Sequence, residues 1–147
     1  MNTYTDLINR RATNTESDEC YTPEDQIIPL LKYLDKEKTY YEATSGKSSS
    51  ILRGFTKHGY NMVGSGSRDF FDCGRSDIFD GVITNPPYSK KDQFLEHCYS
   101  LGKPFALLLP VTSFQGLKRG QMFMDKGMSA LVYNNRIDFT GKGAPTF

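Results

Sequence analysis

The sequence predicts a doubly wound, mostly parallel α/β sheet, and two patterns lead to this fold class. Short apolar runs with strand character alternate with segments whose apolar residues recur at helical spacing. The run from Phe105 to Leu109 is almost entirely apolar, which is typical of a parallel strand that is buried on both faces. With 147 residues, the chain is long enough for one domain around a single core.

The chain is expected to begin with a flexible polar arm over residues 1–20, followed by the domain over residues 21–147. Thr22 is a suitable N-cap and Pro23 a suitable first residue for the helix that follows. Pro29 either kinks this helix or restarts it. The apolar residues of the helix recur at helical spacing: Ile27, Leu30, Leu31 and Leu34.

The remaining elements alternate along the chain. Strands are predicted over residues 39–43, 60–63, 79–84 and 105–109, with further strand material at 130–133 and 136–139. Helices are predicted from residue 51 to about Gly59, over 90–101 and over 117–126. This order gives the strand–helix–strand units of a parallel sheet.

Composition narrows the classes of function. The formal net charge is +1, so any contact with nucleic acid must be made by a local group of charges. No apolar run approaches the roughly 18 residues that span a bilayer, and the polar N-terminus lacks the apolar core of a signal peptide. We therefore expect a cytoplasmic protein without a membrane partner. Three cysteines without metal-type spacing are expected to be free thiols, and no metal site is predicted.

A stiff polar loop over residues 84–89 follows the predicted strand 79–84 and precedes a predicted helix. Ligands of open α/β sheets bind beyond the carboxyl ends of the strands, so this loop lies where a site is expected. Pro86 and Pro87 have fixed φ angles and no N–H group to donate. The loop therefore offers carbonyl acceptors, the carboxamide of Asn85 and the ring of Tyr88, a set that suits a planar group carrying an NH2.

A second loop, over residues 44–50, follows the first predicted strand. Its Gly46-Lys47-Ser48 invites comparison with a phosphate-binding loop, but that pattern needs a glycine five residues before Gly46, where the chain has Tyr41. We interpret the stretch as a ligand-binding turn in which Glu42 ends the strand and Gly46 lets the backbone approach a ligand. An ordinary turn of serines and glycine is the alternative.

Four short motifs together carry a resemblance to a known family. The series Tyr21-Thr22-Pro23, Glu42-Ala43-Thr44-Ser45-Gly46, Asp69-Phe70 and Asn85-Pro86-Pro87-Tyr88 resembles the amino-group DNA methyltransferases that act on adenine, above all the short phage-type members. The resemblance covers most of the chain from Tyr21 onward, including Leu107-Leu108-Leu109-Pro110. It implies the Rossmann-like fold of methyltransferases that use S-adenosylmethionine as their cofactor, and the cytoplasm of a bacterium or of a phage-infected host.

The resemblance also implies roles for individual residues. In the catalytic loop, the Asn85 side-chain oxygen and the Pro86 carbonyl accept from the target NH2, Pro87 stiffens the loop, and Tyr88 stacks on the target base. The target is an adenine of DNA that is flipped out of the duplex. The implied cofactor-binding residues are Thr22 and Pro23 at its methionine end, Glu42, Thr44, Gly46 and Ser65 along its methionine and ribose, and Asp69 and Phe70 at its adenine.

The chain departs from the family pattern at several positions. The usual second glycine of the cofactor loop is Ser48, the proline after the strand is Ala43, and the acidic residue of the second strand is replaced by Ser65 or Gly66. The family sheet closes with an antiparallel hairpin, and we expect this chain to lack its last strand. Two explanations stay open: the chain is a fragment, or it pairs its exposed C-terminal sheet edge with a second copy.

Three alternatives to DNA methylation stay open. The same Asn-Pro-Pro-Tyr loop serves methyltransferases of RNA adenine and of protein glutamine, and a degenerate fold of this kind also suits a non-catalytic module that binds nucleic acid or a protein partner. Four basic side chains flank the expected site and either contact phosphates or are solvated helix ends: Lys90, Lys91, Lys118 and Arg119.

Overall fold

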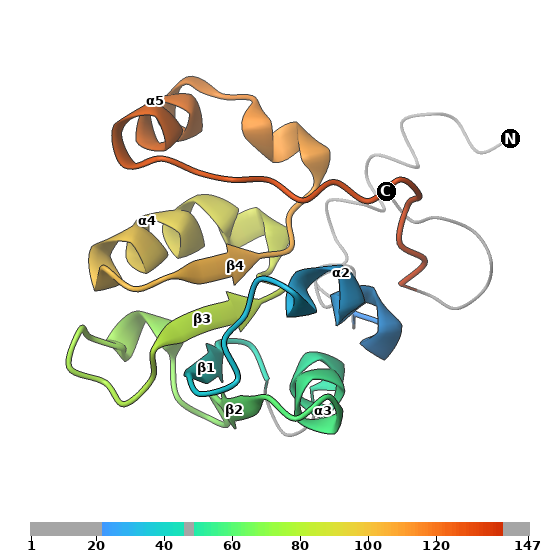
Figure 1. Cartoon of the computed structure of the whole chain (residues 1–147). Helices are drawn as coiled ribbons and strands as arrows, with labels where there is room; N and C mark the ends of the chain where they lie inside the picture. The colour runs from blue at the N-terminus through green and yellow to red at the C-terminus, as the bar shows by residue number, and fades with distance from the viewer. Residues whose placement is uncertain (1–21, 46–48, 140–147) are drawn as a thin grey trace, which may run out of the picture.

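A four-stranded parallel sheet forms the centre of the computed structural model, which describes residues 22–45 and 49–139 (Figure 1). Its strands are β1 (Thr39–Glu42), β2 (Asn61–Gly64), β3 (Gly81–Thr84) and β4 (Phe105–Leu107). Their order in the sheet is β2-β1-β3-β4, and every neighbouring pair is parallel. The predicted α/β class with a parallel sheet is therefore confirmed.

Helices connect and cover these strands (Figure 1). The helix α3 (Ser50–Lys57) joins β1 to β2, and α4 (Lys91–Leu101) joins β3 to β4. The helix α5 (Leu117–Lys126) follows β4, and α2 (Ile28–Leu31) precedes β1. Short 3-10 helices complete the chain: η2 (Glu24–Ile27), η3 (Phe70–Asp72), η4 (Tyr88–Lys90) and η5 (Val111–Phe114). Within the described residues, no helix is long and apolar enough to cross a membrane.

Hydrophobic clusters lie on both faces of the sheet, because successive residues of a strand point to opposite faces. Tyr40 and Ile83 belong to a cluster with Ile51 and Phe55 of α3, and the Phe55 side chain is fully buried. Gly54 of α3 lets η2 pack closely against this helix, since a Cβ at Gly54 would lie 2.9 Å from the side chain of Ile27. The first face of the sheet is thus covered by α3 and η2.

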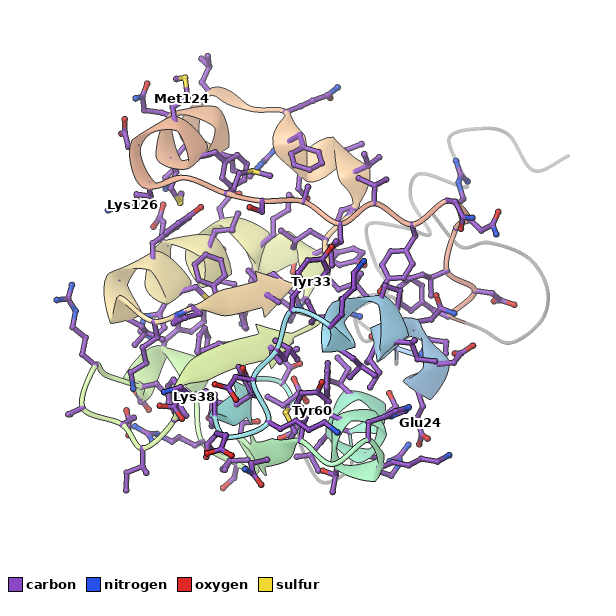
Figure 2. The ribbon with its side chains drawn as sticks, viewed as in Figure 1. Glu24, Tyr33, Lys38, Tyr60, Met124 and Lys126 are labelled. Atoms are coloured by element: carbon purple, nitrogen blue, oxygen red, sulfur yellow. The ribbon has the colours of Figure 1, made fainter. Side chains whose placement is uncertain are left out.

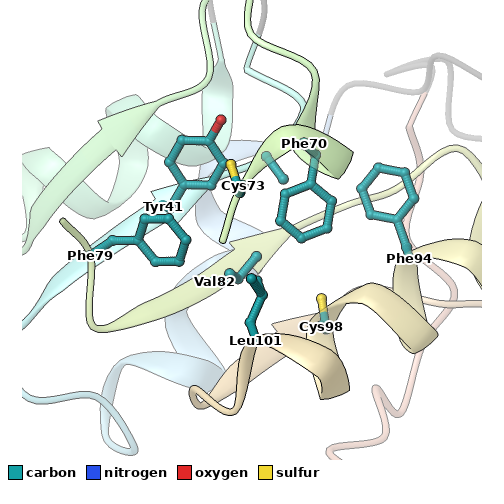
Figure 3. Packing of buried hydrophobic residues seen from close by; sticks show 9 residues of the cluster. Tyr41, Phe70, Cys73, Phe79, Val82, Phe94, Cys98 and Leu101 are labelled. Atoms are coloured by element: carbon teal, nitrogen blue, oxygen red, sulfur yellow. The ribbon is translucent and has the colours of Figure 1, made fainter. Parts of the chain in front are cut away.

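The second face of the sheet is covered by α4 and η3 (Figure 3). Tyr41 and Val82 belong to this cluster, together with residues of the two helices: Phe70, Phe94, Cys98 and Leu101. The Phe70 ring stacks on the Phe94 ring at a centroid distance of 5.1 Å. Because helices cover both faces, the sheet is doubly wound, as the alternation of elements predicted.

The N-terminal helix differs from the expectation in how it begins. The predicted N-cap role of Thr22 is wrong, since η2 begins at Glu24 and Pro23, in the capping position, makes no side-chain cap. The Thr22 hydroxyl instead accepts a hydrogen bond from Asn85, a partner far away in the sequence. Of the two outcomes left open for Pro29, the second is found: α2 begins at Ile28 and carries the proline in its first turn.

Two predictions at the C-terminal side of the sheet are wrong. The residues of β4 are half-buried rather than buried on both faces, because β4 is an edge strand whose neighbour within the described residues is β3. The stretches 130–133 and 136–139 form no strand but belong to an irregular segment after α5. Val132 is 73% exposed, so this segment lacks the packing that stabilises a strand. Pairing of the β4 edge with a second copy stays a prediction.

Free thiols are found at Cys73 and Cys98, and both are buried. Burial raises the pKa of the Cys98 thiol to about 12, so this thiol is protonated at neutral pH and is a poor nucleophile. Cys20 lies outside the described residues. Within residues 22–45 and 49–139, no group of three or more His, Cys, Asp or Glu side chains is placed to hold a metal ion.

The side chain of Lys103 binds the main chain of the loop that precedes β3. We expect these contacts to stabilise the fold. The ammonium group of Lys103 donates to the carbonyl oxygens of Asp77 at 2.6 Å and Phe79 at 2.7 Å, and it lies 4.2 Å from the centroid of the Phe79 ring. Replacing Lys103 by methionine keeps most of the chain length but leaves both carbonyls without this donor. We expect Lys103→Met to lower the free energy of unfolding by about 1–3 kcal/mol in urea denaturation.

The matched control for this variant is Lys126→Met at the exposed end of α5, where both Met124 and Lys126 project from the helix (Figure 2). Its effect should stay within about 0.5 kcal/mol. Equal losses in the two variants would show that the two carbonyl contacts of Lys103 contribute nothing specific.

Candidate functional site

The candidate site lies at the carboxyl ends of β1 and β3, where the order of the strands reverses. The chain passes from β1 to β2 on one side of the sheet, and then to β3 on the other side of β1. In open α/β sheets, the crevice at such a reversal is where ligands bind. The two loops that the sequence singled out, after Glu42 and after Thr84, leave the sheet at this point.

Glu42 is the charged group at the centre of the site. Its side chain is 1% exposed. One carboxylate oxygen, Oε1, accepts from the Thr44 N–H at 3.0 Å, from the Thr44 hydroxyl at 3.0 Å and from the Thr84 hydroxyl at 2.5 Å. The donors are all neutral, and they turn one edge of a buried carboxylate toward the loop after β3.

The Thr44 hydroxyl connects the two loops. It lies 2.8 Å from the hydroxyl of Thr84, which is 40 residues away along the chain, and 3.3 Å from the main-chain oxygen of Asn85. A hydroxyl has one proton to donate, so Thr44 shares that proton among Glu42, Thr84 and Asn85. The turn after β1 and the Asn-Pro-Pro-Tyr loop therefore belong to one hydrogen-bonded unit.

Ser65 links the loop after β2 to the same unit. The Ser65 hydroxyl accepts from the Ser45 N–H at 3.1 Å and lies 3.0 Å from the Ser45 hydroxyl, and the Ser65 N–H donates to the Glu42 carbonyl at 3.0 Å. Gly66 donates its N–H to the Ser45 hydroxyl at 3.3 Å. Three strand ends thus meet through short polar side chains, and the role expected for Ser65 at a cofactor ribose stays a prediction.

The Asn-Pro-Pro-Tyr loop is held from both sides. The Asn85 Nδ2 atom donates to the Thr22 hydroxyl at 3.1 Å, and Thr22 is itself buried. Pro86 is among the most deeply buried residues, and Tyr88 begins η4 directly after Pro87. Asn85 Oδ1 is buried as well. The structure thus brings together Thr22, Glu42, Thr44, Ser65 and Asn85 from four separate segments.

Asp69 and Phe70 lie outside this network in the described structure. The Asp69 carboxylate accepts from the Phe71 N–H at 2.9 Å and caps η3, and the residue is exposed. Phe70 is 3% exposed and packs in the core, where His97 meets its ring edge-on at a centroid distance of 4.8 Å. The neighbouring ring of Phe71 is 37% exposed and is the one that a ligand could meet from solvent. The roles expected for Asp69 and Phe70 stay predictions.

Two further residues, Gly46 and Pro23, were also expected to bind the cofactor. Gly46 lies outside the described residues. Pro23 is half-buried and precedes η2 directly. Thr84 and Ser45 were missed as site residues by the sequence reasoning, although a polar residue that ends the apolar run before Asn85 is a signal that could have pointed to Thr84.

The basic side chains around the site have intramolecular partners. Lys118 forms an ion pair with Glu96 of α4. Arg119 pairs with Asp92 at 2.7 Å and also donates to the Ser113 carbonyl at 2.8 Å, so it fastens η5 to the first turn of α4. Lys91 donates to the Tyr88 carbonyl at 3.2 Å. Within the part of the chain that the structure describes, the charges of Lys118 and Arg119 are thus paired, whereas Lys90 and Lys91 form no ion pair and keep their positive charge beside the loop.

Comparison with known proteins adds no identification to this geometry. No model of a known protein family matches the chain, and no curated protein and no solved structure shows significant similarity to it.

Proposed function

We propose that the chain is an S-adenosylmethionine-dependent methyltransferase that transfers a methyl group to the N6 amino group of adenine in DNA. The observation that carries the proposal is the hydrogen-bonded connection of the turn after β1 to the Asn-Pro-Pro-Tyr loop after β3, through Glu42, Thr44 and Thr84. A methyl donor held by the first loop would lie beside an amine held by the second. The finer fold, a Rossmann-like methyltransferase sheet without its last strand, is part of this proposal.

Glu42 supports the choice of cofactor. A buried carboxylate is stabilised by a cation nearby, yet the three hydrogen bonds to Glu42 come from neutral donors and no described Lys or Arg forms an ion pair with it. The methionine end of S-adenosylmethionine carries an ammonium group that fits this charge, and the hydroxyl of Ser65 fits a ribose. When bound, this cofactor supplies an electrophilic methyl group.

The residues of the second loop would act on the amine. Asn85 Oδ1 and the Pro86 carbonyl would accept the two N–H groups of the adenine, which draws the nitrogen lone pair out of conjugation with the ring. The lone pair would then form the bond to the methyl carbon as the bond from this carbon to the cofactor sulfur breaks. The electron pair of the broken bond would stay on sulfur, S-adenosylhomocysteine would leave, and the proton of the alkylated nitrogen would pass to solvent. This is catalysis by positioning and by preorganised dipoles, without a covalent protein intermediate.

Tyr88 would hold the base itself. Flipping an adenine out of a duplex costs a few kcal/mol, and stacking on an aromatic ring contributes about 1–3 kcal/mol. Because Asn85 Oδ1 is buried in this structure, we expect binding of the base to include a local opening around the loop.

The proposal is tested by transfer of a tritiated methyl group from S-adenosylmethionine to three acceptors: unmethylated DNA, RNA and a glutamine-containing protein. We expect label in DNA, at N6 of adenine. If only RNA or only protein is labelled, DNA is not the acceptor, but the chain is still a methyltransferase of amino groups. No label in any acceptor, together with no calorimetric binding of the cofactor, would contradict catalysis and favour a non-catalytic binding module.

A further inference from the structure

We infer that Lys90 and Lys91 form a cationic surface beside the Asn-Pro-Pro-Tyr loop and that this surface contacts the phosphates of the nucleic-acid substrate. The inference rests on the proposed function, because it concerns the polymer that carries the target base. It goes beyond that function by naming the part of the chain that holds the sugar–phosphate backbone. It also separates two of the four basic side chains near the site from the other two.

The two lysines lie directly beside the ring that is proposed to stack on the base. Tyr88 begins η4, Lys90 ends it, and Lys91 begins α4. The Lys91 ammonium group donates to the Tyr88 carbonyl oxygen at 3.2 Å, and the Lys90 side chain is exposed. Lysine side chains are long and flexible, so both charges can reach the phosphates that flank a base held by Tyr88.

The acidic residues of α4 do not neutralise these lysines, because cations of α5 engage them. Asp92 accepts from Arg119 at 2.7 Å, and Glu96 forms an ion pair with Lys118. Asp92 and Glu96 are the acidic residues of α4. Pairing between the two helices therefore leaves uncompensated positive charge at the end of α4 that adjoins the site.

A phosphate backbone is the partner that fits this surface. Two adjacent cations repel each other, and a phosphate placed between them is attracted to both. The formal net charge of the chain is only +1, so attraction to a polyanion depends on such a local group of charges. Lysines that contact phosphates position a nucleic acid without reading its sequence. A glutamine side chain of a protein carries no anion of this kind, so the surface favours a nucleic acid over a protein as the acceptor.

The double variant Lys90→Met, Lys91→Met tests the inference, because methionine keeps most of the side-chain length but carries no charge. The full chain is titrated with a short fluorescent DNA duplex at a series of salt concentrations. The target sequence need not be known, since contacts with phosphates do not depend on it. We expect the affinity at about 0.1 M salt to fall by about 10- to 100-fold. The slope of log K against log salt should become about 1.8 less steep, because each neutralised phosphate of a duplex contributes about 0.9.

Two control variants separate local contacts from net charge. Lys38→Met, Lys126→Met removes the same number of charges, but Lys38 directly precedes β1 at the amino edge of the sheet and Lys126 ends α5 (Figure 2). Glu96→Gln, Lys118→Met removes one ion pair and keeps the net charge. Both controls should keep the salt slope within about 0.5 of the wild type. An equal loss of slope in the first control would show that net charge alone matters, and would overturn the inference.

A single variant covers the case that the double variant does not fold. Lys91→Met removes the contact with the Tyr88 carbonyl, whereas Lys90 is exposed and its replacement removes charge from the surface alone. Lys90→Met should therefore fold like the wild type by circular dichroism, and its salt slope should be about 0.9 less steep. A folded Lys90→Met that binds the duplex with the slope and affinity of the wild type would overturn the inference.

The two proposals can fail separately. Binding of the duplex that depends on Lys90 and Lys91, without methyl transfer to any acceptor, would contradict the proposed function alone. Methyl transfer to DNA by a wild type whose salt slope the Lys90→Met, Lys91→Met variant leaves unchanged would contradict the role of the two lysines alone.

Discussion

Replacing Asn85 by alanine is expected to lower the rate of methyl transfer by at least about 10²–10³-fold, the loss typical when one preorganised polar group is removed from an active site. The reason is that alanine removes the oxygen that would accept from the target amine, while the main-chain contact with Thr44 can persist. The measurement is the initial rate of tritiated methyl transfer at saturating S-adenosylmethionine, with circular dichroism as the check on folding.

Asn134→Ala is the control for this variant, because Asn134 is an exposed asparagine outside the site. It should transfer methyl groups at the wild-type rate. Asn85→Asp adds a second comparison: it keeps an acceptor oxygen but has no NH2 for Thr22, so its rate should fall between those of the wild type and Asn85→Ala. If Asn85→Ala is as active as the wild type, the role given to this loop is wrong.

Replacing Glu42 by glutamine is expected to weaken S-adenosylmethionine binding by about 10- to 100-fold, because a hydrogen bond or ion contact to a charged group contributes about 1.5–3 kcal/mol. Glutamine can still accept from Thr44 and Thr84 through its carbonyl oxygen. We therefore expect the free energy of unfolding to change by less than about 1 kcal/mol, since removing a buried charge also removes its desolvation cost. Titration calorimetry and urea denaturation measure the two effects.

Glu42→Leu separates charge from hydrogen bonding. Leucine leaves the donors at Thr44 and Thr84 without their acceptor, and each buried unsatisfied group costs about 1–3 kcal/mol, so this variant should lose both affinity and stability. Glu37→Gln, at an exposed position, is the control and should lose neither. If Glu42→Gln binds S-adenosylmethionine as tightly as the wild type, the ammonium group of the cofactor does not contact Glu42.

The sequence predicted best those parts of the fold that short-range patterns determine. The spacing of apolar residues predicted α4 and α5 at nearly their observed bounds, and the polar residues after two apolar runs marked the loops that meet at the site. The alternation of strands and helices was enough for a doubly wound parallel sheet, because such units can bury their apolar faces in few other ways.

The wrong predictions concern features that depend on which residues are neighbours in the folded structure. An apolar run such as 105–109 does not say whether its strand lies at the centre or at the edge of a sheet, and the edge position leaves β4 half-buried. The runs at 130–133 and 136–139 have strand propensity, but without a hydrogen-bonded neighbour they form no strand. Thr22 has the propensity of an N-cap, yet its hydroxyl contacts Asn85, 63 residues along the chain.

By itself, then, the sequence determined the type and order of most elements and the chemical character of the loop at Asn85, because fixed prolines, an amide and an aromatic ring act through local geometry. Only the tertiary structure decided that Glu42, Thr44 and Thr84 form one hydrogen-bonded unit and that Thr22 holds the Asn85 carboxamide. The physical reason is that a hydrogen bond depends on distance and direction in space, and the order of the strands in the sheet, rather than their order along the chain, brings these side chains together.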